Sequence, residues 1–310
     1  GNMASIACTL WAMCFLCRMA RDGGAWRLLP AGLLCGLAVM MKPNGWIPVL
    51  AMLIVMGLWF LSEKKWKLLP LLLLLVLGPM LCTKTVEKAY SAASKADLTG
   101  GIPMTAYLAM GLQESSRAPG WYNEYVDRVY KATGYDPEKT SSRAKKNLRF
   151  RMNEFAEDPA YAVCFFHEKM VSQWNETTFE AIWISKTCPY EKKARSAFGS
   201  AALNGSLRDG LEKWMEGYTI ALYALFSLTM GAFARKLLRR PKEGEAPVPR
   251  PLGLGLSLCA VIVTGAFLYH MIFEAKSQYL FIYLFVMIPA AAWGLSRFFE
   301  KGGFRKQARS

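Results

Sequence analysis

Lys276, Ser277, Gln278 and Tyr279 follow one another in a short turn between two apolar segments. The charge pattern of the chain puts this turn at the outer face of a membrane. A cation held at that depth must be neutralised by a neighbouring group or must bind an anion. Lipid-linked phosphates are the obvious anions there. Glu274 could simply neutralise Lys276. With Gln278 and Tyr279, the same pair also forms a donor-rich rim suited to a diphosphate or a sugar.

A second cation, Lys42, begins the sequence Lys42-Pro43-Asn44-Gly45, where two apolar segments meet almost without a loop. Pro and Gly at this point favour a turn or a broken helix. Lys42 could be a lysine that snorkels to the membrane surface. It could equally contact a phosphate, beside the N–H groups that begin the next helix.

A third cluster of aromatic and polar residues lies in the long segment between the apolar runs. Such side chains suit sugar binding, and they are equally typical of the aromatic belts at membrane interfaces. The candidate binding residues are Trp121, Tyr122, Asn123, Gln173 and Trp174, accompanied by Lys169, Asn175, Glu176, Glu180 and Trp183.

The elements that position these residues are apolar helices. The chain is 53% hydrophobic and only 20% charged, and several runs approach the roughly 20 residues that cross a bilayer. We therefore predict an all-α integral membrane protein with about seven spans. The expected spans are 3–17, 28–41, 46–62, 68–83, 218–233, 252–269 and 279–295, of which the second is short.

Loops rich in Lys and Arg alternate with loops that have few of them, as the positive-inside rule requires. The loops expected to be cytoplasmic carry Arg18, Arg21, Arg27, Lys64, Lys65, Lys67, Arg235, Lys236, Arg239, Arg240, Lys242, Arg250, Arg297, Lys301, Arg305, Lys306 and Arg309. The opposite span ends carry only Lys42, Lys84 and Lys276. The net charge of +15 is thus a topology signal, and it does not predict a nucleic-acid surface.

Three blocks follow from this pattern: a four-span bundle in 1–84, an extracytoplasmic helical domain in 85–216, and a three-span bundle with a basic cytoplasmic tail in 217–310. Within the second block, Asp136-Pro137 and Asp158-Pro159 predict two helix starts.

Only Cys164 and Cys188 fall in that block, and an oxidising exterior would permit them to pair. No Cys/His cluster has metal-ligand spacing, so we predict no metal site and no cofactor and leave dependence on a divalent metal open.

Two motifs resemble those of the GT-C superfamily of membrane glycosyltransferases, especially bacterial relatives of the protein O-mannosyltransferases and the lipid A aminoarabinose transferases. Gly36-Leu37-Ala38-Val39-Met40-Met41-Lys42-Pro43 is similar to that family's helix end, and Glu274-Ala275-Lys276-Ser277-Gln278-Tyr279 is similar to its Glu-x-x-x-Arg-Tyr. The resemblance implies a multi-pass protein of the bacterial cytoplasmic membrane. It also implies transfer of a sugar from a polyprenyl-phosphate donor to an envelope glycopolymer, lipid or protein.

The resemblance implies that Lys42 contacts the phosphate of the donor. Gln278 stands where the family has Arg, and Lys276 could supply the missing charge. The family's catalytic acid belongs to the first outer loop, which has no counterpart here, so we expect the catalytic residue upstream of Gly1. Two other classes stay open: a transporter or lipid flippase, and a non-catalytic membrane scaffold whose outer block binds a partner.

If the transferase interpretation holds, Lys42→Ala weakens binding of the lipid-phosphate donor far more than Lys84→Ala does. Both lysines are expected at outer span ends, but only Lys42 lies in a turn. Donor binding to the two purified variants measures the difference. Equal losses would indicate generic lipid anchoring by either cation.

Overall fold

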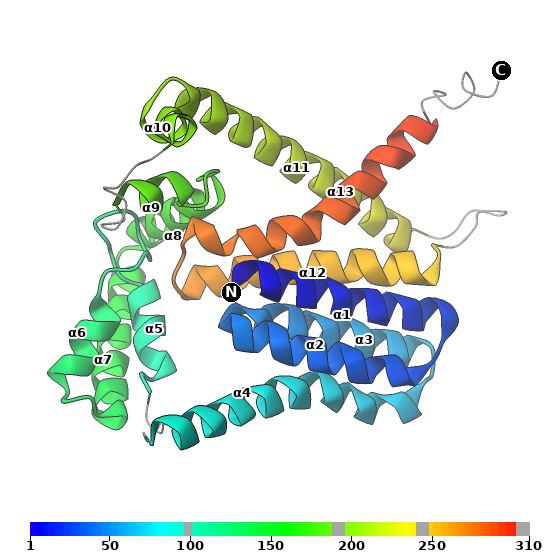
Figure 1. Ribbon diagram of the computed structural model, residues 1–310, viewed down its shortest axis with the longest axis horizontal. Coiled ribbons are helices and arrows are strands. Elements are labelled where there is room, and N and C mark those ends of the chain that lie inside the picture. Colours follow the sequence, from blue (N-terminus) through cyan, green and yellow to red (C-terminus); the bar gives the residue numbers. More distant parts are fainter. Residues whose placement is uncertain (96–100, 188–195, 240–247, 302–310) are drawn as a thin grey trace. The chain divides into compact units, whose positions relative to one another are not determined.

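The computed structural model describes residues 1–95, 101–187, 196–239 and 248–301 (Figure 1). Every regular element in these ranges is a helix, as predicted. Six helical stretches are long and apolar enough to cross a membrane: Asn2–Asp22, Pro43–Ser62, Trp66–Ser94, Leu207–Leu238, Arg250–Ile272 and Phe281–Glu300. The protein is therefore an all-α integral membrane protein.

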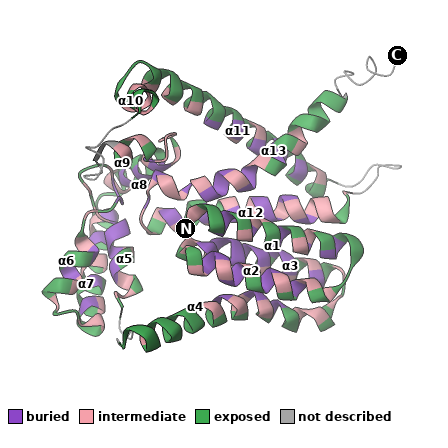
Figure 2. Ribbon diagram, in the orientation of Figure 1, coloured by how far each residue is buried: buried purple, intermediate pink, exposed green. Residues whose placement is uncertain are grey.

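The second expected span is the exception among the seven. It forms η1 (Ala25–Arg27) and α2 (Leu28–Met41), an apolar helix shorter than the other six. The others are α1 (Asn2–Asp22), α3 (Trp46–Ser62), η3 with α4 (Trp66–Leu72 and Leu73–Ser94), α11 (Leu207–Leu238), α12 (Arg250–Ile272) and α13 (Phe281–Lys301). Large apolar side chains remain exposed along α4, among them Leu73, Leu77 and Leu81 (Figure 2). A bilayer would cover such side chains in place of protein.

The chain divides into two compact units. Unit 1 comprises Gly1–Ala96, Ala221–Ala266 and Ile282–Ser310, and unit 2 comprises Asp97–Ile220 and Phe267–Phe281. The residues that join α12 to α13, which the sequence places within the last membrane block, thus belong to the same unit as the long polar segment.

Unit 2 contains the helices α5 (Met104–Gly111), α6 (Tyr125–Ala132), α7 (Pro137–Glu157), α8 (Pro159–Trp174), α9 (Ala181–Thr187) and α10 (Ala197–Asn204). The two predicted helix starts are confirmed. The Asp136 carboxylate accepts hydrogen bonds from the backbone N–H groups of Glu138 and Lys139, and Asp158 accepts one from Tyr161. Each carboxylate satisfies N–H groups that have no partner inside the helix. The apolar faces of α5, α6 and α7 meet around Met110, Val126 and Ala144.

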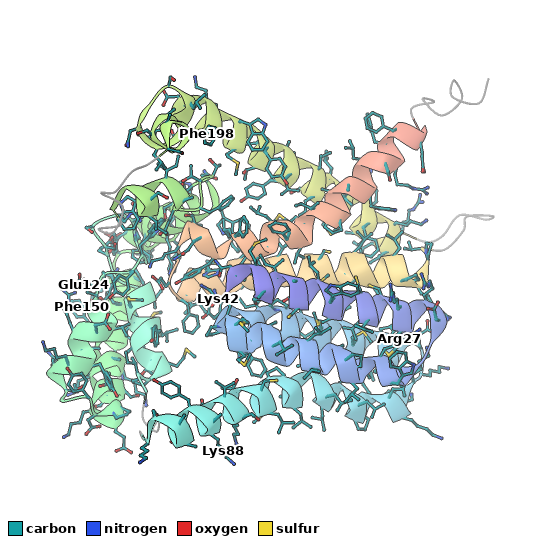
Figure 3. All side chains as sticks on the ribbon, in the orientation of Figure 1. Arg27, Lys42, Lys88, Glu124, Phe150 and Phe198 are labelled. Atoms are coloured by element: carbon teal, nitrogen blue, oxygen red, sulfur yellow. The ribbon has the colours of Figure 1, made fainter. Side chains whose placement is uncertain are left out.

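The predicted break after Lys42 is also confirmed. α2 ends at Met41, Lys42 is extended, and a single 3-10 turn (Pro43–Gly45) leads into α3. Figure 3 labels Lys42 at this break and Lys88 on α4. Both lysines belong to unit 1.

Glycine allows α2 and α4 to touch through their backbones. A Cβ built on Gly78 of α4 would collide with the carbonyl of Gly32 on α2, and one built on Gly36 would lie 2.7 Å from the Gly78 carbonyl oxygen. Gly32 and Gly36 are spaced as small-xxx-small, the pattern that permits close helix approach in membranes. The short α2 is therefore held by backbone packing against a longer helix.

We expect Gly78→Ala to destabilise unit 1 by about 1–3 kcal/mol, because the added methyl group forces the two backbones apart. Gly231→Ala on α11 is the matched control, since a Cβ there meets nothing within 4 Å. Thermal unfolding in one detergent compares the variants. Equal melting temperatures for Gly78→Ala and the wild type would contradict the close approach.

Candidate functional site

The connection between α12 and α13 carries Glu274, Lys276, Gln278 and Tyr279, and it ends in a 3-10 turn (Ser277–Tyr279). This connection is held by one face of α8, although about 100 residues separate them in the chain. The sequence placed the candidate residues of these two regions in separate clusters. Within unit 2 they come together.

Three polar side chains of α8 and its end bind the connection at successive points. Lys169 Nζ donates to the Met271 carbonyl oxygen at 3.1 Å, and Gln173 Nε2 donates to the Lys276 carbonyl oxygen at 3.2 Å. Ser277 Oγ donates to Glu176. Lys169 and Gln173 have the helical spacing i, i+4 on one face of α8, and Glu176 follows two residues after the helix ends. We call Lys169, Gln173 and Glu176 the α8 polar stripe.

Two glycines make room for this stripe. Lys169 Nζ also donates to the Gly111 carbonyl oxygen, and the Gly120 carbonyl oxygen accepts a hydrogen bond from Ala275 N at 3.0 Å. Gly120 has φ +72, and a Cβ there would lie 2.7 Å from Lys169 Cδ. A Cβ on Gly111 would lie 2.6 Å from the Phe273 carbonyl carbon. Any side chain at either position would push the lysine or the connection away.

Lys169 itself is wholly buried. Burial lowers the pKa of its ammonium to about 7, although the negative charge of Glu274 opposes the shift. The hydrogen bonds to Gly111 and Met271 both end on neutral main-chain carbonyls. The amine therefore sits near the midpoint of its titration at neutral pH, where a surface lysine would be fully charged.

The Lys276 ammonium lies beside a carboxylate and an aromatic ring. Its Nζ is 3.1 Å from Glu274 Oε1, and it lies over the Tyr122 ring at 4.9 Å from the centroid. Tyr279 donates a hydrogen bond of 2.8 Å to the other Glu274 oxygen. The neutralising ion pair considered from the sequence is thus present. The side chains of Lys276 and Glu274 keep 21% and 16% of their surface exposed, although the Glu274 Oε1 atom is itself buried.

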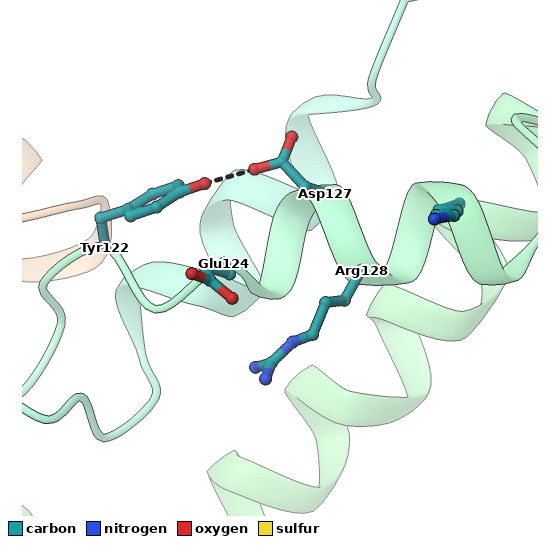
Figure 4. Close-up of a pocket in the computed structure, with 5 residues that line it drawn as sticks. Tyr122, Glu124, Asp127 and Arg128 are labelled. Atoms are coloured by element: carbon teal, nitrogen blue, oxygen red, sulfur yellow. Dashed lines mark hydrogen bonds between the residues drawn. The ribbon is translucent and has the colours of Figure 1, made fainter. Parts of the chain in front are cut away.

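Tyr122 links this pair to a small cavity. Its hydroxyl donates to Asp127, and that hydrogen bond is the main reason that the pKa of the phenol rises to about 12 (Figure 4). Tyr122, Asp127 and Arg128 line a cavity of about 220 Å³ together with Glu124 and Lys131. The phenol therefore stays protonated, with its ring toward Lys276 and its hydroxyl toward Asp127.

The other candidate residues of the third cluster hold the unit together. Trp121 is buried and donates from Nε1 to Ser172 Oγ at 2.8 Å. The Asn123 amide donates to Gln113 Oε1 and to the Glu114 carbonyl oxygen, each at 3.0 Å. Gln173 belongs to the α8 polar stripe, and Trp174 packs on Phe267 with ring centroids 5.9 Å apart. These contacts give each of the four a structural role within unit 2.

Arg117 was not among the candidate residues, yet it is a centre of contacts in unit 2. Its guanidinium lies 4.4 Å from the Trp121 ring and 4.1 Å from the Trp183 ring, and 3.8 Å from Glu180 Oε2. Glu180 is 2% exposed, and burial raises the pKa of its carboxyl. No periodic pattern marks Arg117, because it lies in a loop and two of its partners, Glu180 and Trp183, come from a distant part of the chain.

The remaining candidates lie elsewhere or outside the described residues. Lys42 belongs to unit 1, at the break between α2 and α3. Cys164 is exposed on α8, whereas Cys188 lies outside the described residues, so their pairing stays a prediction. Within the described residues, no group of three or more His, Cys, Asp or Glu side chains is placed to hold a metal ion.

Comparison of the chain with protein-family models, with curated proteins and with solved structures gave no match. Function must therefore be inferred from the chemistry of unit 2, chiefly from the α8 polar stripe and the connection around Lys276.

The buried Lys169 predicts a pH dependence of stability with a definite sign. Its pKa is about 7 in the folded chain and about 10.4 when unfolded, so the unfolded state binds more protons between these values and stability rises with pH there. The slope is up to about 1.4 kcal/mol per pH unit. Lys169→Met removes this dependence.

Thermal unfolding at pH values from about 7 to 9, between the folded and unfolded pKa values, compares the wild type with Lys169→Met. The quantity compared is the slope of stability against pH. Lys145→Met on the exposed side of α7 is the control, and it should keep the slope of the wild type. Parallel curves for Lys169→Met and the wild type would show that the buried amine does not titrate in this range.

Proposed function

We propose that this chain forms the donor-binding and outer part of a membrane glycosyltransferase that uses a polyprenyl-phosphate sugar. One observation carries the proposal: a partly exposed lysine, at the end of a membrane helix, is held in place through the main chain around it. The acceptor is a glycopolymer, lipid or protein of the bacterial envelope.

Rigid support is what a phosphate-binding lysine at a membrane surface needs. A free lysine loses about 2 kcal/mol of side-chain entropy when it is fixed on a ligand. The Lys276 backbone is already fixed, because Gln173 binds its carbonyl oxygen and Ser277 binds Glu176. The ion pair with Glu274 and the contact with the Tyr122 ring already restrain the side chain, so less of this entropy remains to be lost on a ligand.

The ion pair with Glu274 is compatible with phosphate binding. A phosphate oxygen that approaches Lys276 takes the place of Glu274 Oε1, while Oε2 keeps its hydrogen bond from Tyr279. The displaced carboxylate stays close to the phosphate, and this repulsion favours release of the lipid phosphate after transfer. Gln278 supplies amide donors where a second cation would hold the product more tightly. Lys42 remains a proposed phosphate contact in unit 1.

The scaffold alternative is favoured by a different observation. Trp121, Asn123 and Gln173 are occupied by contacts inside unit 2, and Lys276 already has a carboxylate partner. A protein that only displays unit 2 to a partner would need no more than this. The two functions differ in whether a lipid phosphate binds.

Binding of polyprenyl phosphate to the chain reconstituted in neutral-lipid nanodiscs tests the proposal. We expect Lys276→Gln to weaken binding roughly 10-fold or more, since hydrogen bonds to charged groups contribute about 1.5–3 kcal/mol. Lys88→Gln on the exposed end of α4 is the control for loss of one charge and should bind as the wild type does.

A polyprenyl alcohol of the same length shows whether the protein recognises the phosphate or the lipid chain. The alcohol should fail to compete with polyprenyl phosphate, because it has no phosphate. If alcohol and phosphate bind alike, or if Lys276→Gln and Lys88→Gln behave alike, the donor-binding proposal is wrong and the scaffold function is favoured.

A further inference from the structure

A second and larger cavity lies in unit 2, lined by residues of α9 and of the first turns of α11. Figure 1 shows these two helices. The cavity volume is about 540 Å³, within the range of small-ligand sites in proteins. Its lining includes Asn175, Thr177, Trp183, Arg208, Glu212 and Glu216. Within the described residues, it is distinct from the cavity beside Tyr122.

Trp183 gives this cavity an aromatic wall. The Arg117 guanidinium lies 4.1 Å from the ring centroid, and Arg117 is itself fixed by Trp121 and Glu180. The cation covers one face of the indole and restrains its rotation, yet Trp183 stays 46% exposed. A fixed, half-exposed indole is a stacking surface for the C–H face of a sugar ring.

The polar groups of the wall divide into those already used and those available. Glu176 lines the cavity, but its carboxylate accepts hydrogen bonds from the backbone N–H groups of Thr178 and Glu180 and from two hydroxyls. Arg208 Nε is paired with Glu212 Oε1 at 2.9 Å. The groups that can meet a ligand are the side chains of Asn175, Thr177 and the exposed Glu216. Together they can donate to and accept from hydroxyl groups.

The charge of the wall selects against anions. Arg208 is balanced by Glu212, so Glu176 and Glu216 leave the cavity negative. A phosphorylated or uronic-acid ligand would place a further negative charge beside these two carboxylates, which weakens its binding. The lipid-phosphate donor is therefore not the ligand expected here.

We propose that this cavity binds the acceptor of the transfer as an uncharged glycan, with one sugar ring stacked on Trp183 and its hydroxyls bound by Asn175, Thr177 and Glu216. The proposal rests on the proposed transferase function and selects the glycopolymer among the three acceptor classes. It assigns unit 2 two ligand sites of opposite preference: an anionic lipid at Lys276 and a neutral sugar at Trp183.

Saturation-transfer NMR with neutral trisaccharides (cellotriose, maltotriose and chitotriose) tests the cavity directly in the whole reconstituted chain. At least one should bind with roughly millimolar affinity, and tri-galacturonate should bind at least tenfold more weakly. Trp183→Leu should abolish binding. Trp214→Leu is the control, because Trp214 is 65% exposed on α11 and stacks on Tyr218 away from the cavity wall.

A second variant guards against misfolding of Trp183→Leu. Glu216→Gln changes an exposed side chain on α11, and it should weaken trisaccharide binding several-fold while leaving the melting temperature unchanged. No binding by any trisaccharide, or equal binding by Trp183→Leu, would overturn the proposal. Binding of trilysine in preference to every sugar would also overturn it and assign the cavity to a basic peptide.

These outcomes are separate from those at Lys276. Sugar binding at Trp183 requires no donor and no transfer. Trisaccharide binding without polyprenyl-phosphate binding would retain the glycan site and reject the transferase function. Binding of polyprenyl phosphate without binding of any trisaccharide would retain the transferase function and reject the glycan site.

Discussion

The arrangement of unit 2 depends on the hydrogen bonds that join α8 and the residues just after it to the connection between α12 and α13. Lys169, Gln173 and Glu176 bind this connection at Met271, Lys276 and Ser277. Because two of the contacts are to carbonyl oxygens, they fix the backbone and leave the side chains of Glu274, Lys276 and Tyr279 to interact with one another. A Cβ has no room at Gly120, which lies against Lys169, or at Gly111, which lies against the backbone of the connection at Phe273.

Much of the helical framework could be predicted from local sequence. Asp136 and Asp158 cap the helices that they were expected to begin, and Pro43 and Gly45 break the chain where expected. These features depend on residues a few positions apart, so the sequence contains them directly. The packing of the short helix 28–41 on α4 through Gly32 and Gly36 was not predicted, because it depends on which helix lies opposite.

The candidate site could be predicted only in part. Lys276, Glu274 and Tyr279 were recognised as one group because they are neighbours in sequence. The α8 polar stripe was not, because two of its partners are main-chain carbonyls, which every residue has and which leave no sequence signature. Arg117 was missed for a related reason: its two indole partners lie far apart in the chain. Residue type suggested ligand binding for Trp121, Asn123 and Gln173, whereas burial and hydrogen bonding give them structural roles.

The burial of Lys169 also constrains the order in which the protein is assembled. A ribosome completes α8 about 100 residues before it reaches Met271, and domains form in that order during synthesis. Until Met271 has been synthesised, the Lys169 ammonium lacks one of its two acceptors, and its burial is less favourable. The buried amine therefore gains its second acceptor only after the end of α12 has been synthesised, so residues translated late complete the hydrogen bonding of a helix translated about 100 residues earlier.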